Sequence, residues 1–136
     1  MAEEVSSELP VERRWAITPN WFSVNNRSMT AILENCLCQE CNKKIHSEGK
    51  QSTPESLMEA ILNCCSHSPG FINEKMPVLE AIFRFFLTNG NTPVTIEELI
   101  EQINRLKGGN AYYNSPEALL RILKADIYYG LQEIQY

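Results

Sequence analysis

The sequence lacks the features of a secreted or membrane-embedded protein. It opens with an acidic segment, where a signal peptide would have a basic start followed by an apolar run. Its apolar stretches are far shorter than the roughly 20 residues that a membrane-spanning helix needs. We therefore predict a cytoplasmic protein without a membrane-spanning segment. Residues 1–12 hold few large apolar side chains and are predicted to form a disordered acidic arm.

Basic residues and the common catalytic motifs are also scarce. The chain has 12 Lys and Arg against 17 Asp and Glu, so its formal net charge of -5 disfavours a general attraction to nucleic acid or anionic lipid. There is no G-x-S-x-G, no P-loop, no Rossmann glycine pattern and no H-E-x-x-H. We therefore predict that the protein is not an enzyme, with no catalytic residues and no site for an organic cofactor.

What the sequence does contain is enough apolar material for one domain. The 136 residues have a hydrophobic fraction of 43%. Apolar residues recur at helical spacing in about five segments, whereas short segments at residues 15–17 and 127–134 are rich in strand-forming residues. This pattern predicts a mainly α-helical fold with a small β element. We expect a Cys-rich metal-binding region at residues 13–72 and a second region at 73–136, packed together as one compact unit.

The ends of the expected helices are marked by capping residues. Thr53 precedes a proline and an acid, and Thr95 forms a capping box with Glu98 three residues later. The segment at residues 38–51 has little apolar content and is predicted to be a loop. The five helices are expected at residues 25–36 (beginning at Asn25 or Asn26), 53–67, 76–87, 95–107 and 115–125.

Five cysteines lie within thirty residues, and this is the most informative pattern in the chain. In a reducing cytosol such a group more often binds metal than forms disulfides, and an odd number pairs poorly. Cys38 and Cys41 form a C-x-x-C, whose two thiolates can bind one ion from a single turn. Cys36 completes the apolar stripe of the first helix, so we predict that it belongs to the core.

Two further ligands are needed to complete a tetrahedron around the ion. Our first choice is Cys64 and Cys65, although adjacent side chains on a regular helix diverge by about 100°. The alternative replaces one of them with His67, which shares a helix face with Cys64, and His46 is a further candidate. We predict a structural zinc ion. An iron–sulfur cluster is less expected because no common ferredoxin spacing is present, and a dithiol redox centre lacks the usual strand-then-helix context.

The order of elements after residue 76 resembles a winged-helix domain, with three helices, a short strand after the first and a final strand. The resemblance makes the helix at residues 115–125 the counterpart of the recognition helix. Too few residues follow it for a two-stranded wing, so we expect the last strand to pair with Val94 or with residues 15–17. Basic residues on the expected recognition helix are offset by acids, which makes DNA binding a possible rather than a required role.

The whole chain also resembles a group of small uncharacterised bacterial proteins. The shared segments are Cys38–Cys41, Cys64-Cys65-Ser66, Pro69-Gly70-Phe71 and Tyr128-Tyr129-Gly130. The resemblance implies no particular activity.

Three hypotheses of function follow from these patterns. The first is a zinc-stabilised helical binding module, a protein–protein adaptor connected with transcription. The second is a DNA-binding winged-helix regulator that senses metal or redox state through its cysteines. The third is a small iron–sulfur or dithiol redox protein.

Overall fold

The protein is mainly helical, as predicted, with a small antiparallel sheet. The computed structural model describes residues 13–48, 52–106 and 115–134, so the arm predicted at residues 1–12 lies outside the described part. In chain order the elements are β1 (Arg14–Ile17), α1 (Pro19–Val24), α2 (Met29–Glu34), α3 (Gln39–Glu48), α4 (Pro54–Asn63), the 3-10 turn η2 (Cys65–His67), α5 (Val78–Thr88), β2 (Val94–Thr95), α6 (Ile96–Leu106), α7 (Pro116–Lys124) and β3 (Leu131–Ile134).

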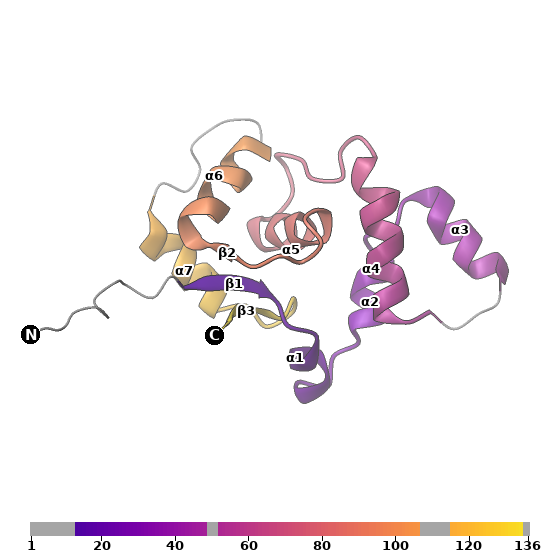
Figure 1. Ribbon diagram of the computed structural model, residues 1–136, viewed down its shortest axis with the longest axis horizontal. Coiled ribbons are helices and arrows are strands. Elements are labelled where there is room, and N and C mark those ends of the chain that lie inside the picture. Colours follow the sequence, from indigo (N-terminus) through magenta and orange to yellow (C-terminus); the bar gives the residue numbers. More distant parts are fainter. Residues whose placement is uncertain (1–12, 49–51, 107–114, 135–136) are drawn as a thin grey trace, which may run out of the picture.

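The elements fall into two groups on either side of α5. Helices α2, α3 and α4 lie toward one end of the molecule, and the sheet with α6 and α7 lies toward the other (Figure 1). Helix α5 contacts both groups, through α4 on one side and through α6 and β1 on the other. None of the described helices is long and apolar enough to cross a membrane.

The first strand lies in the middle of the sheet, whose order is β2-β1-β3. Trp15 of β1 is opposite Val94 of β2 and opposite Glu133 of β3, and both pairings are antiparallel. The expected pairing of the last strand with residues 15–17 is therefore confirmed. Strand β1 thus completes a sheet whose other two strands come from the region after residue 73.

The last strand begins later than predicted, at Leu131 instead of residue 127. The carboxylate of Asp126 accepts hydrogen bonds from the backbone N–H groups of Tyr128, Tyr129 and Leu131, each at 2.9 Å. An acidic side chain that bonds the backbone in this way stabilises a turn instead of an extended strand. The strand-forming composition of this segment is overridden by the turn.

The side chain of Asn91, which comes before β2 in the chain, extends the pairing with β1 as far as Ile17. Its amide accepts a hydrogen bond from the Ile17 N–H and donates one to the Ile17 carbonyl, both at 2.9 Å. Asn91 adopts a φ of 58°, a left-handed conformation that asparagine tolerates better than most residues. One amide side chain thereby satisfies both backbone groups at the end of β1.

The helix predicted from residue 25 to residue 36 is shorter in the structure, where α2 covers Met29–Glu34 and a separate helix, α1, precedes it at Pro19–Val24. Pro19 lies in the first turn of α1, where a proline loses no helical hydrogen bond. Asn26 has a φ of 56° and separates the helices. The second helix is capped by Ser28, whose hydroxyl accepts a hydrogen bond from the Ala31 N–H.

The loop predicted at residues 38–51 is also wrong, because residues 39–48 form helix α3. Cys41 and Ile45, four residues apart, are the partly buried side chains among its residues 39–47, and the others are exposed. An acid in its first turn and a histidine in its last turn suit the helix dipole. The apolar stripe is too narrow to stand out from a polar loop in the sequence.

The remaining helices begin close to where the sequence predicts. Thr53 and Ser56 form a capping box at the start of α4, and Thr95 and Glu98 form one at the start of α6. The hydroxyl of Ser115 caps α7 by accepting a hydrogen bond from the backbone.

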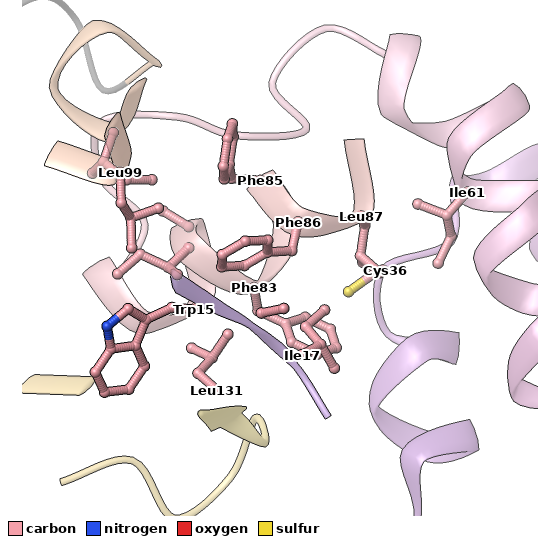
Figure 2. Packing of buried hydrophobic residues seen from close by; sticks show 14 of the residues in the cluster. Trp15, Ile17, Cys36, Ile61, Phe83, Phe85, Phe86, Leu87, Leu99 and Leu131 are labelled. Carbon is pink, nitrogen blue, oxygen red and sulfur yellow. The ribbon is translucent and has the colours of Figure 1, made fainter. Parts of the chain in front are cut away.

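The core is built around α5, which contributes six buried residues. Ile61 packs from the helical end, and Ile17 and Leu131 pack from the sheet (Figure 2). Leu33 of α2 and Leu57 of α4 belong to the same cluster. Together, the buried side chains of these helices and strands exclude water from the centre of the fold.

Cys36 belongs to this core, as predicted. It is 5% exposed, and Figure 2 shows its sulfur among the buried apolar side chains. Its thiol lies 3.6 Å from the Ile32 carbonyl, to which it donates. Burial raises the pKa of Cys36 to about 11, so the neutral thiol is the stable form.

Candidate metal centre

Four cysteines from two parts of the chain converge beside α4. The sulfurs of Cys38, Cys41, Cys64 and Cys65 all lie within 4.8 Å of one another. We call these four residues the cysteine cluster. Cys38 and Cys64 are separated by 26 positions in the sequence, yet their sulfurs are 3.8 Å apart. The cluster therefore links the segment before α3 to the end of α4.

Cys64 and Cys65 can face the same point because helix α4 ends just before them. Helix α4 stops at Asn63, and Cys64 has a φ of -133° and a ψ of -66°, well outside helical geometry. Cys65 then begins the 3-10 turn η2. The divergence of about 100° expected for neighbours on a regular helix does not apply to this pair.

Cys38 and Cys41 are held by backbone hydrogen bonds at the start of α3. The Cys38 N–H donates to the Cys65 sulfur at 3.1 Å, and the Cys38 carbonyl accepts from Asn42 at 2.9 Å. A hydrogen bond from the Cys41 backbone N–H to the Cys38 sulfur, aided by the Cys65 side chain, lowers the pKa of Cys38 to about 7. N–H donors aimed at a sulfur favour its thiolate form, which is the form that binds metal.

The Cys41 and Cys65 thiols hold their protons more tightly when no ion is bound. Desolvation by burial, followed by the neighbouring Cys64 and Cys38 side chains, raises the pKa of Cys41. Burial also raises the pKa of Cys65, which is 0% exposed. Four thiols packed together cannot all ionise without a cation between them, because like charges repel in a low dielectric. A divalent ion would supply that charge and release the protons.

The spacing of the sulfurs fits a single tetrahedral ion. A Zn–S bond of about 2.3 Å gives a tetrahedron whose sulfur–sulfur edges are about 3.8 Å. The Cys38–Cys64 pair already has this separation, and the widest pairs would close by about 1 Å on binding. Four thiolates are one of the donor sets that structural zinc sites use, beside sets in which histidine replaces one or two of them.

Neither histidine belongs to this group. His46 is exposed on α3 and His67 is exposed on η2. Among the described residues, the group of potential ligands that share a common point consists of cysteines alone. The arrangement brings together the four residues chosen first from the sequence and leaves out both alternates.

A cleft of about 830 Å³ opens beside the cluster, between α3 and α4. Cys41 and Cys64 lie on its wall, Ile45 and Ala60 provide apolar surface, and Lys44 provides a cation. Cys65 is not among the lining residues and is fully buried. The cluster therefore has one side open to solvent and one side covered by the core.

The α3 side of this cleft was missed from the sequence, because residues 38–51 were expected to be a loop. The available signal was the spacing of Cys41 and Ile45, which share one face of a helix.

Comparisons of the chain with protein-family models, curated proteins and solved structures found no match.

Proposed function

We propose that the protein is a helical binding module whose cysteine cluster holds one structural zinc ion. The observation that carries this proposal is the convergence of four sulfurs within 4.8 Å from two separate segments. The role of the ion is to fix α3 and the segment before it to the end of α4. No residue of the site is assigned a catalytic step.

The spacing supports one ion instead of a cluster of several. An iron–sulfur cluster places iron and sulfide ions between its cysteine ligands, so the cysteine sulfurs must spread further apart than around a single ion. Tetrahedral thiolate sites with one ion suit zinc and, in some proteins, iron. We therefore expect purified protein to be colourless and to contain zinc at one ion per chain. A brown protein with a visible absorption band would contradict the zinc assignment.

Exposed apolar side chains support a protein partner. Ile127 and Tyr128, in the turn before β3, are 55% and 51% exposed, and Val24 at the end of α1 is 70% exposed. The guanidinium of Arg27 lies 5.0 Å from the centre of the Tyr128 ring, so these two turns are neighbours. Aromatic and arginine side chains of this kind are enriched where proteins bind one another.

Substitution separates this surface from the metal centre. We expect Ile127→Ser with Tyr128→Ser to abolish co-purification of a specific partner while zinc content stays unchanged. Leu62→Ser is the matched control, because Leu62 is a 37% exposed apolar residue on α4, away from the sheet. Equal loss of the partner in both variants would contradict the assignment of the surface.

A winged-helix regulator that binds DNA is the second candidate. It is supported by the order α5, β2, α6, α7, β3 and by exposed Arg121 and Lys124 in the last turn of α7. The negative net charge and the exposed Glu117 on the same helix weigh against it. Retention of random duplex DNA at low ionic strength would favour this candidate, and no retention would remove it.

A further inference from the structure

We propose that the metal centre is also a redox switch, in which a peroxide joins Cys38 to Cys64, expels the ion and frees helix α3. This inference rests on the proposed zinc site and adds its regulation. It uses three observations: the separation of two sulfurs, the open side of the cluster, and the way α3 is attached to the rest of the fold.

The first observation is geometric. The Cys38 and Cys64 sulfurs are 3.8 Å apart, whereas the cluster as a whole extends to 4.8 Å. They belong to segments 26 residues apart, one before α3 and one at the end of α4. Each lies at a helix end, where the chain can adjust more readily than inside a helix. A bond between them would keep these two segments together without an ion.

The second observation is access. Cys64 lines the cleft between α3 and α4, so a small solute can reach its sulfur from solvent. Cys65 is fully buried, and Cys36 lies in the core outside the cluster. An oxidant entering through the cleft therefore meets Cys41 and Cys64, and the Cys38 sulfur lies 3.8 Å from that of Cys64. Oxidation of cysteine depends on thiolate character and exposure, and binding to zinc keeps the sulfurs as thiolates.

The third observation is the weak attachment of α3. Among its residues 39–47, Cys41 and Ile45 are partly buried, and the other side chains are exposed. Figure 1 shows α3 at the outer end of the molecule, next to α4. Of its two anchors, the bond from Cys41 to the ion is the stronger, since a half-buried isoleucine removes only part of its apolar surface from water. Loss of the ion would leave α3 with the packing of Cys41 and Ile45 against the core and with the covalent link at Cys38, just before its first residue.

The chemical step balances with hydrogen peroxide as the oxidant. The Cys64 thiolate attacks one peroxide oxygen, the O–O bond breaks, and Cys64 sulfenic acid and hydroxide are formed. The Cys38 thiolate then attacks the Cys64 sulfur, a disulfide forms, and a second hydroxide leaves. Two electrons pass from the two sulfurs to the peroxide. Of the four residues of the cysteine cluster, Cys41 and Cys65 then remain as ligands, and two ligands do not hold zinc in competition with a chelator.

The test begins with the zinc-loaded full chain and adds hydrogen peroxide in the presence of a chromogenic zinc chelator. We expect one zinc ion to be released for each disulfide formed, and peptide mapping to place that disulfide between Cys38 and Cys64. Limited digestion with trypsin reports on α3 through its exposed Lys43 and Lys44. We expect cleavage after these two lysines to become about tenfold faster after oxidation, since local opening governs proteolysis.

Two controls keep the outcomes distinct. Cleavage after Lys124, an exposed lysine on α7, should not change. Cys36→Ala should release zinc at the wild-type rate, because Cys36 is outside the cluster. Reduction followed by added zinc should restore slow cleavage of α3.

The outcomes also separate this inference from the proposed function. Protein that binds no zinc before peroxide is added overturns both. Protein that binds zinc but forms a different disulfide, or releases zinc without faster cleavage of α3, overturns the switch and leaves the structural site standing.

Discussion

Gly130 is the position where one added methyl group tests the fold most sharply. It follows the two tyrosines in the turn before β3 and adopts a φ of 66°. A Cβ atom built there would lie 2.8 Å from the Phe22 ring and 3.3 Å from the Thr18 carbonyl. The Gly130 carbonyl also accepts hydrogen bonds from the Thr18 N–H and hydroxyl, so this segment cannot move away without losing them.

Two costs add up in the variant Gly130→Ala. The left-handed backbone costs alanine about 1–2 kcal/mol, and displacing a buried ring costs about 1–3 kcal/mol, so the free energy of unfolding should fall by about 2–5 kcal/mol. Phe22 is 2% exposed, which leaves its ring little room to shift. The measurement is urea denaturation followed by circular dichroism.

Gly70 is the matched control for the steric part of this cost. It has a φ of 79°, but no atom lies within 4 Å of the Cβ position. Gly70→Ala should therefore lower the free energy of unfolding by the backbone cost alone, about 1–2 kcal/mol. Phe22→Leu removes the ring atoms that the new methyl group would meet and should bring the effect of Gly130→Ala close to that of Gly70→Ala. Equal destabilisation by the two alanines in the wild-type background would refute the close approach of Phe22 to Gly130.

Three further predictions concern the sheet, a capping box and the thiols. Asn91→Gly should lower the free energy of unfolding by about 1–3 kcal/mol, because it removes both hydrogen bonds to β1, and Asn91→Ala should lower it more. Hydrogen bonds from the backbone and hydroxyl of Thr95 hold the pKa of Glu98 below its ordinary 4.5, so ionised Glu98 stabilises the fold above that pH. The stability difference between wild type and Glu98→Gln should therefore shrink as the pH falls through that range; a constant difference would contradict it. In metal-free protein at mildly alkaline pH, iodoacetamide should label Cys38, whose pKa is about 7, well before Cys36, whose pKa is about 11; the reverse order in peptide mapping would contradict the burial of Cys36.

The parts of the fold that could be predicted from the sequence are those with strong local signals. Capping residues mark the starts of α4, α6 and α7, and each start is found within about a residue of the expected position. The core role of Cys36 also followed from local spacing. In these places one stretch of chain carries its own evidence.

The parts that could not be predicted depend on contacts between distant segments. Helix α3 has a narrow apolar stripe, and its place beside α4 is defined by Cys41 in the cluster and by Ile45. The turn before β3 depends on one carboxylate that bonds three backbone groups, which outweighs strand propensity.

The sequence predicts which four cysteines form the candidate site, but not how the fold brings them together. Their spacing points to the four cysteines, and adjacent side chains at residues 64 and 65 would diverge on a regular helix. Helix α4 ends at Asn63, so this divergence does not arise. No residue near position 63 marks that end in the sequence, because the helix-ending Pro69 and Gly70 come later.

The central claim is that the cysteine cluster binds a single zinc ion, and X-ray absorption at the zinc edge tests it most directly. The account predicts four sulfur neighbours at about 2.3 Å, with no imidazole scattering and an unchanged spectrum in Cys36→Ala. A spectrum with nitrogen or oxygen neighbours, or with fewer than four sulfurs, would contradict it.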